Sequence, residues 1–161
     1  MVARNSVGQE PESTESGAAP GPPQSPFDIL GEAGVKKLAA AFYAVRDECT
    51  DVAEVRAMHA GNMDEITRKL AAYLTGWMGG PPVYLALNGS VCLTDAHARY
   101  HIGPRQRDQW LMCMDRALER INASDELKAM LKEPMFRVAD AVRNQESSDP
   151  ASLAPNIIAR G

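Results

Sequence analysis

Residues 93–114 read LTDAHARYHIGPRQRDQWLMCM, and this stretch decides what the fold can be. A lone histidine, His97, follows a short segment that has no hydrophobic period. Gly103 and Pro104 then mark a helix start, because proline is well tolerated in the first helical turn. The apolar residues that follow recur at three- and four-residue steps, which predicts an amphipathic helix over 103–121. Its apolar face carries Trp110, Met114, Leu118 and Ile121.

The same helical spacing recurs in three other segments. The first, over 35–49, opens after the sequence GEAG at 31–34, and its apolar stripe is Val35, Leu38, Phe42 and Val45. The second, over 62–77, has Asn62 as its N-cap, and its stripe is Met63, Ile66, Leu70, Tyr73, Leu74 and Trp77. The third, over 124–144, starts at Ser124, and its stripe is Leu127, Met130, Leu131, Met135, Val138 and Val142. Since strand-like alternation occurs nowhere at useful length, the sequence predicts an all-α fold.

The connections between these helices carry helix-breaking residues. Residues 79–82, Gly-Gly-Pro-Pro, end the helix over 62–77. The stretch from there to about Asp95 shows neither period, so we expect a loop with one short helical turn before His97. A short helical piece ending near Met58 is expected after the first helix. Pro134 lacks a backbone N–H, and we expect it to kink the last helix or split it in two.

The composition describes one acidic globular domain. The chain has 161 residues, enough for one hydrophobic core, and 45% of them are apolar. The net charge of −4 and the lack of a basic block argue against a nucleic-acid partner. No apolar run is long enough to span a membrane. We expect residues 1–25 to be a disordered extension, 26–144 to be the domain and 145–161 to be a flexible tail.

The cysteines indicate the redox compartment. Cys49, Cys92 and Cys113 are odd in number and include no C-x-x-C pair. This usage favours a reducing cytoplasm over a disulfide framework, and it offers no ligand spacing for zinc. Since C-x-x-C-H is also missing, any haem would be held non-covalently.

Three side chains on separate segments suggest the chemistry of a metal cofactor. His97 supplies a nitrogen base, Tyr43 a phenol and Trp110 an indole. This set suits an iron tetrapyrrole, for which the protein supplies ligation, hydrogen bonds and access. Taken singly, each of them is more often an ordinary core or surface residue. A haem-free helical interaction module is therefore the alternative.

The order of these residues along the chain resembles that of a known family. Residues 26–35 read PFDILGEAGV, Phe42 and Tyr43 follow, and residues 77–81 read WMGGP. With the segments 97–102 and 107–114, these blocks cover most of 26–144, and this span resembles the truncated haemoglobins, specifically their group II. The resemblance implies a two-over-two helical sandwich that encloses haem b. Its helices B, E, G and H would be 35–49, 62–77, 103–121 and 124–144, with a short helix F ending at His97.

The resemblance also implies roles for the residues around the iron. His97 matches the proximal histidine that ligates the metal, Tyr43 the distal tyrosine of helix B, and Trp110 the tryptophan of helix G. His59 falls at the start of the connection between helices C and E, and we expect it to orient the Tyr43 hydroxyl. The resting iron is expected to be five-coordinate, water-ligated, or bound by Tyr43 or His59 as a sixth ligand.

Further residues are implied to contact the haem. Ile66 falls where many globins keep a distal His or Gln, and Leu70 lies one turn later. Lys69 matches a basic position whose side chain reaches a propionate. We expect the Leu93 carbonyl, one turn before His97, to accept a hydrogen bond from the imidazole. Met114 is also expected to contact the haem.

The sequence departs from the family pattern around the proximal histidine. Ala96 stands where the family often has arginine, and Ala98-Arg99-Tyr100 stands where Ala-Pro-Phe is usual. We therefore expect Arg99 or His101 to take over part of the propionate pairing. Tyr100 is expected to contact the cofactor.

The function expected from these residues is reversible binding of O2 with slow release. Bound O2 carries partial negative charge, and both Tyr43 and Trp110 can donate hydrogen bonds to it. Such a bond contributes about 1.5–3 kcal/mol, so each donor should slow O2 release roughly 10- to 100-fold. Ile66 and Leu70 would keep the pocket dry, which strengthens the remaining donors.

Slow release suits redox work better than simple transport. NO dioxygenation, peroxide turnover and sensing are the candidate activities, with a haem peroxidase as the second hypothesis because Tyr43 and Trp110 are oxidisable. The expected partners are O2, CO and NO, with peroxide or sulfide as further ligands and an unidentified reductase as electron donor.

Overall fold

The chain is helical throughout the residues that its computed structural model describes, which are 24–59, 61–89, 92–146 and 148. In chain order the elements are α1 (Pro26–Glu48), the 3-10 turn η1 (Thr50–Val52), α2 (Ala53–Met58), α3 (Met63–Trp77), α4 (Val83–Asn88), α5 (Leu93–His97), α6 (Pro104–Arg120) and α7 (Asp125–Ala141). No strand occurs within these ranges, and the all-α prediction is confirmed. None of the described helices combines the length and apolar character that crossing a bilayer requires.

The predicted terminal segments fall largely outside the described residues. This holds for the N-terminal extension up to residue 23 and for the C-terminal tail from residue 149 on. Of the predicted tail, Gln145 donates its backbone N–H to the Ile102 carbonyl, and the Ser148 hydroxyl accepts from the backbone N–H of Arg105. The start of this segment is thus tied to the domain.

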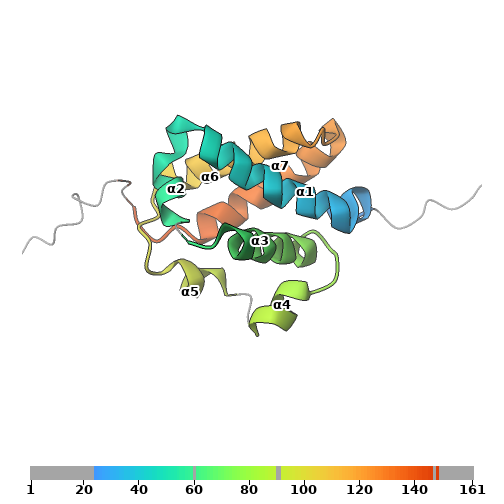
Figure 1. Ribbon diagram of the computed structural model, residues 1–161, viewed down its shortest axis with the longest axis horizontal. Coiled ribbons are helices and arrows are strands. Elements are labelled where there is room, and N and C mark those ends of the chain that lie inside the picture. Colours follow the sequence, from blue (N-terminus) through green and yellow to red (C-terminus); the bar gives the residue numbers. More distant parts are fainter. Residues whose placement is uncertain (1–23, 60, 90–91, 147, 149–161) are drawn as a thin grey trace, which may run out of the picture.

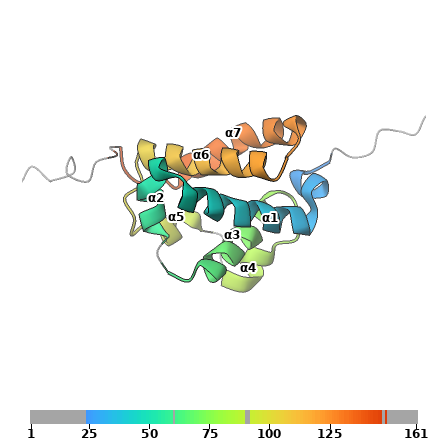
Figure 2. The ribbon, with the colours of Figure 1, turned by 45° about the horizontal axis from the view of Figure 1, so that its top comes forward.

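Four long helices form two stacked pairs. α6 and α7 pack together, and α1 packs against both α6 and α3. Figure 2 shows this stacking, with α6 and α7 above α1 and with α3 below it. The short helices α4 and α5 lie beyond α3 in the view of Figure 1. This arrangement confirms the two-over-two sandwich expected from the sequence.

The core lies where the stripe of α1 meets α6 and α7. Val35, Leu38 and Phe42 are completely buried, as predicted. The side chains packed around them from the other two helices are Cys113, Met114, Ala117, Leu118, Leu127, Leu131 and Met135. Burying one large apolar side chain contributes about 1.5–3 kcal/mol. This cluster therefore fixes α1 against α6 and α7.

Helix starts coincide with the predicted capping residues. The Asn62 side-chain oxygen accepts from two backbone N–H groups in the first turn of α3. The Ser124 hydroxyl accepts from the Leu127 N–H at 3.2 Å and so caps α7. Pro104 occupies the first turn of α6. These caps satisfy N–H groups that have no partner inside the helix.

α1 begins earlier than the sequence pattern indicates. Ser25 forms a capping box with Asp28, and Pro26 is the first helical residue. At Gly31 the backbone leaves the helical region, with φ 69° and ψ 174°, so the helix bends there before the apolar stripe begins. The positive φ is a conformation that glycine adopts without steric cost.

Two expectations about chain breaks are wrong in part, although the short helical turn expected before His97 is present as α5. The segment after Pro82 forms a helix, α4, and not a loop; it is six residues long and ends at Gly89, which is left-handed at φ 68°. Six residues are too few to show a hydrophobic period. Of the two outcomes predicted for Pro134, the split does not occur, since α7 runs through this residue, and the kink stays a prediction. Leu131 and Met135 are buried on either side, and this packing offsets the hydrogen bond that proline removes.

Candidate functional site

A cavity of about 300 Å³ lies between the helices and collects most of the predicted site residues. Its size is at the lower end of the range for ligand pockets. The predicted residues that line it are Tyr43, His59, Ile66, Lys69, Leu70, Leu93, His97, Arg99, Tyr100 and Trp110. Met114 and His101 are not among the lining residues. Met114 is completely buried in the core because its face of α6 turns toward α1.

His97 approaches the cavity from the end of α5. Its Nδ1 lies 2.6 Å from the Leu93 carbonyl oxygen, the partner expected from the sequence. A carbonyl can only accept, so Nδ1 carries the hydrogen, and in the neutral imidazole Nε2 then has the lone pair. A neutral imidazole held in this way is a suitable ligand for a transition metal.

Tyr43 lines the cavity from α1, and its ring belongs to a cluster of packed aromatic rings. It is 7% exposed, and its ring meets Phe42 edge-on with centroids 5.1 Å apart. Trp110 from α6 packs on the same Phe42 ring at 5.4 Å. Burial raises the pKa of the Tyr43 phenol well above its ordinary value, and the positive charge of Arg46 opposes this only in part. The phenol therefore keeps its proton and can donate it in a hydrogen bond.

His59 lies beside Tyr43, at the end of α2. The two rings meet edge-on at 5.5 Å, and His59 Nδ1 lies 2.9 Å from the Val55 carbonyl oxygen. This nitrogen is thus engaged by the backbone, and only Nε2 is left for the hydrogen bond to Tyr43 that the sequence suggests. Burial lowers the pKa of His59, and the nearby Arg46 charge lowers it further.

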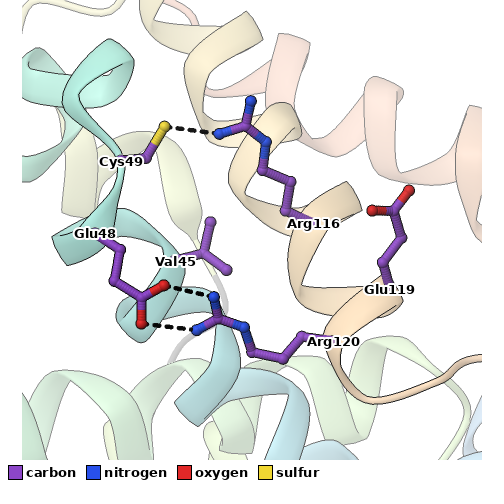
Figure 3. A pocket seen from close by; sticks show the side chains of 6 residues that line it. All are labelled: Val45, Glu48, Cys49, Arg116, Glu119 and Arg120. Carbon is purple, nitrogen blue, oxygen red and sulfur yellow. Dashed lines mark hydrogen bonds and ion pairs between the residues drawn. The ribbon is translucent and has the colours of Figure 1, made fainter.

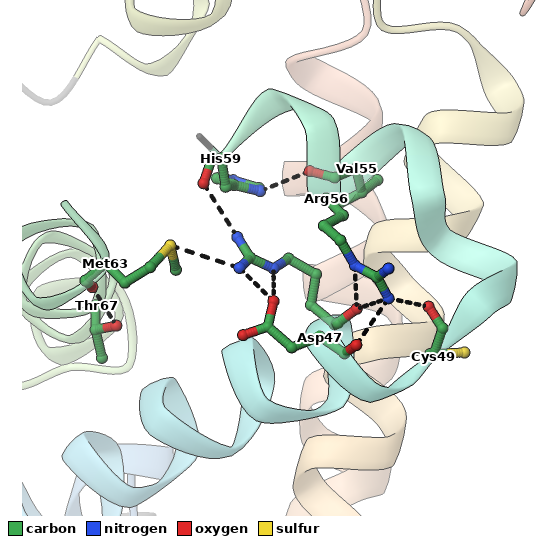
Figure 4. A network of polar contacts seen from close by, with 8 residues as sticks. Asp47, Cys49, Val55, Arg56, His59, Met63 and Thr67 are labelled. Carbon is green, nitrogen blue, oxygen red and sulfur yellow. Dashed lines mark hydrogen bonds and ion pairs between the residues drawn. The ribbon is translucent and has the colours of Figure 1, made fainter. Parts of the chain in front are cut away.

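Arg46 contacts both Tyr43 and His59, and the sequence did not identify it as part of the site. It is 3% exposed and lies with its guanidinium 5.1 Å from the centre of the Tyr43 ring. It donates to the Asp47 carboxylate at 2.5 Å and to the His59 carbonyl at 3.4 Å. Arg56 donates in turn to backbone carbonyls at the end of α1 (Figure 4). A charged residue next to an apolar stripe usually faces solvent, so the sequence holds no signal for this contact.

The remaining walls are apolar and aromatic. From α3 come Ile66, Leu70, Tyr73, Leu74 and Trp77, and from α7 and its C-cap come Met135, Val138, Ala139 and Val142. Tyr73 also meets Tyr84 of α4 edge-on at 5.6 Å. The α3 stripe is therefore only partly buried, because much of it faces the cavity and not the core. Tyr84 was missed with α4 itself.

Three cationic side chains line the cavity, and each has a partner. Lys69 pairs with Glu65 at 3.0 Å on the exposed face of α3. Arg99 donates to the Tyr100 hydroxyl at 2.9 Å and lies over that ring. Arg107, which the sequence analysis did not single out, pairs with Asp140 at 2.7 Å.

The comparisons with known proteins agree with this geometry. Residues 25–144 match the sequence model of the family described as bacterial-like globin. The chain belongs to this family. A curated group 2 truncated hemoglobin of Bacillus subtilis strain 168 is 25% identical to this globin over 128 residues, which are 80% of this chain and 95% of the relative.

Solved structures place the globin within group II. The group II 2-on-2 hemoglobin of the plant pathogen Agrobacterium tumefaciens is 34% identical, with a TM-score of 0.72 over 77% of this chain and 97% of that one. A cold-adapted truncated hemoglobin of the Antarctic marine bacterium Pseudoalteromonas haloplanktis is 31% identical, with a TM-score of 0.72 over 76% of this chain and 100% of that one. The resemblance to group II truncated haemoglobins is confirmed.

A second pocket of this globin lies where the end of α1 meets α6 (Figure 3). Arg120 grips the Glu48 carboxylate with two hydrogen bonds, of 3.0 and 2.5 Å. Arg116 donates to the Cys49 sulfur at 2.8 Å. The polar groups here bind one another across an exposed surface, and none of the predicted site residues lines this pocket. It is a helix–helix contact rather than a second ligand site.

Proposed function

We propose that this globin holds a non-covalent haem b through His97 and binds O2 with slow release. What supports the proposal is the placement of His97 in the same cavity as the two hydrogen-bond donors Tyr43 and Trp110. Membership of the truncated globin family implies haem-based binding of diatomic gases. The proposal adds to this that His97 ligates the iron and that Tyr43 and Trp110 slow the release of O2.

The lining of the cavity fits a haem. Apolar and aromatic side chains of α3 and α7 suit the porphyrin faces, and a small number of polar groups suit its orientation. His97 presents the lone pair of Nε2, because Nδ1 is engaged by Leu93. Lys69, Arg99 and Arg107 are the cations that could pair with the propionates. When bound, the haem iron supplies the coordination position for O2, CO or NO.

The chain's own contribution on the distal side is hydrogen bonding. Tyr43 keeps its proton because burial raises its pKa, so it can donate to a partly negative ligand. Trp110 can only donate, through its indole N–H. Ile66 and Leu70 offer no hydrogen bond and limit the access of water to the same space.

Haem reconstitution of the His97→Ala variant tests the proximal assignment. We expect the purified chain to show a Soret band, and His97→Ala to lose haem faster and to change its ferrous spectrum. Adding imidazole to His97→Gly should restore that spectrum. His101→Ala is the matched control, because His101 lies four residues on but does not line the cavity. If His97→Ala took up haem with unchanged affinity and spectra, the proposal would be refuted.

Peroxide turnover is the second candidate, and the aromatic lining favours it. Besides Tyr43 and Trp110, the oxidisable side chains Trp77, Tyr73 and Tyr84 surround the cavity. Oxidation of guaiacol by H2O2 should then run well above the rate of free haemin, and an equal rate would dismiss this activity. A haem-free interaction module would instead show no Soret band after reconstitution.

We also propose a cytoplasmic setting for this globin. The odd number of cysteines, with no C-x-x-C pair among them, favours a reducing cytoplasm. NO dioxygenation, sensing, binding of sulfide and an electron-donating reductase are hypotheses that the slow release of O2 makes worth testing.

A further inference from the structure

The segment that carries His97 has little hydrophobic anchorage of its own. α5 has only five residues, Leu93–His97. Among the described side chains of residues 92–101 none is buried, and the first buried one is Ile102, at 5% exposure. Burial therefore does little to fix the position of His97. Hydrogen bonds from a neighbouring element have to do so.

Asn144 supplies such bonds from just beyond the end of α7. Its side-chain NH2 donates to the Tyr100 carbonyl at 2.7 Å and lies 3.4 Å from the His97 carbonyl. Its side-chain oxygen accepts from the Ile102 N–H at 3.0 Å. One amide side chain thus contacts the last residue of α5 and two residues of the link between α5 and α6.

The Asn144 backbone reinforces this attachment. Its N–H donates to the Ile102 carbonyl at 2.9 Å, and the Gln145 N–H donates to the same carbonyl at 3.1 Å. Both polar groups of the Ile102 backbone are therefore bonded to Asn144. The Tyr100 N–H closes a turn onto the His97 carbonyl at 3.0 Å, which joins the attached link directly to the histidine.

The anchor itself is rigid. α7 is fixed in the core by Leu131, Met135 and Ala139, all buried. Its packing against α6 fixes the direction in which the chain leaves at Ala141. Asn144 is thus connected to the core through α7, and its hydrogen bonds fix the end of α5 relative to that core.

We propose that Asn144 is a positioning residue for His97. The Asn144 side chain binds the carbonyls of His97 and Tyr100 and the N–H of Ile102. These bonds fix the position of the imidazole and therefore the alignment of its bond to a metal. This inference rests on the proposed ligation by His97. It assigns to a residue 47 positions away in the sequence a role in the proximal ligand.

Two variants separate the hydrogen bonds that carry this role. Asn144→Ala removes all the side-chain contacts. Asn144→Asp keeps an acceptor for the Ile102 N–H but loses the donor to Tyr100 and turns a carboxylate toward two carbonyl oxygens. Ser124→Ala is the matched control: it removes the cap at the other end of α7, away from α5. Circular dichroism of each variant checks that its helix content equals that of the wild type.

The readouts are the iron–histidine stretching band of the reduced haem protein, by resonance Raman, and the rate of haem transfer to an excess of another apoglobin. We expect both Asn144 variants to shift or broaden the band and to lose haem about ten-fold faster, since at least one well-formed hydrogen bond is lost. Ser124→Ala should match the wild type. An unchanged band and rate in both Asn144 variants, or an equal change in Ser124→Ala, would overturn the inference.

The same measurement distinguishes failure of the inference from failure of the function on which it rests. The wild type should show the band, and His97→Ala should lack it. A wild type without the band would overturn the ligation by His97, and the positioning role with it. A normal wild-type band that the Asn144 variants leave untouched would overturn the positioning role alone.

Discussion

Replacing Tyr43 and Trp110 by phenylalanine, singly and together, measures how much each donor slows O2 release. Tyr43→Phe deletes only the hydroxyl. The ring keeps its edge contacts with Phe42 and His59, at 5.1 and 5.5 Å, and its place under Arg46. Trp110→Phe removes the indole N–H and leaves a smaller ring against Phe42. A change in release rate in Tyr43→Phe therefore reports on the hydrogen bond and not on packing.

The expected magnitude follows from the partial negative charge of bound O2 and, for Tyr43, from the burial of the donor. Tyr43 is 7% exposed, and a hydrogen bond to a charged acceptor in such a place contributes about 1.5–3 kcal/mol. Loss of the Tyr43 donor should accelerate O2 dissociation roughly 10- to 100-fold, and loss of the Trp110 donor similarly. Since both rings rest on Phe42, we expect the two effects to be coupled, so that the double variant departs from the product of the singles.

Stopped-flow displacement of O2 by CO gives the rates. Tyr73→Phe is the matched control. Tyr73 lines the same cavity and also loses its hydroxyl group, but its ring pairs with Tyr84 of α4 and not with Phe42. It should stay within about two-fold of the wild type. Wild-type rates in Tyr43→Phe, Trp110→Phe and the double variant would refute the assignment of these side chains as donors.

Three further perturbations test the framework around the cavity. Arg56→Met removes the guanidinium that donates to carbonyls at the end of α1 and should lower the free energy of unfolding by about 2 kcal/mol in urea titrations; an unchanged midpoint would count against this cap. Because burial lowers the pKa of His59 from 6.5, the unfolded chain binds more protons, and stability falls as the pH drops below about 6.5. His59→Phe should reduce that fall, and an identical pH dependence in the two proteins would contradict a buried neutral imidazole. In Gly80→Ala the new methyl would lie 2.7 Å from the Phe27 ring, and we expect the free energy of unfolding to fall by about 1–3 kcal/mol. Gly76→Ala is the control, since its methyl meets only ordinary contacts at 3.6 Å and should be neutral or stabilising. Equal thermal midpoints in the two variants would refute the steric argument.

The long helices were predictable because their signals are local. The stripe of Val35, Leu38 and Phe42 recurs at helical spacing, and all three side chains are buried. Asn62 and Ser124 were recognisable as caps from the residue type alone, and both accept the expected backbone hydrogen bonds. The Leu93 carbonyl was expected to lie within reach of the His97 ring, since four residues make one helical turn.

Two kinds of feature escaped the sequence. α4 is too short for a period, although Pro82 at its start and the left-handed Gly89 at its end were signals that could have located it. Arg46 and Asn144 escaped for a different reason. Their partners are set by the tertiary fold, and no spacing rule connects Asn144 to Tyr100, 44 residues earlier in the chain. The roles of the predicted site residues stay predictions until variants are measured.

The polar residues that the sequence did not reveal share a position in the architecture. The cavity is lined partly by short elements with little buried surface of their own, such as α2 and α5. Each is attached to a long helix by side-chain to backbone hydrogen bonds: Gln109 of α6 accepts from the Val55 N–H, Arg56 of α2 binds the end of α1, and Asn144 after α7 binds the link that follows α5. A hydrogen bond fixes direction as well as distance, whereas an apolar contact permits sliding. In this small domain the apolar faces of the long helices already pack against one another in the core. Hydrogen bonds can therefore hold His59 and His97 in fixed positions at the cavity without further buried apolar surface. On this reasoning Asn144→Ala should change the iron–histidine stretching band more than a core substitution that lowers the free energy of unfolding by the same amount.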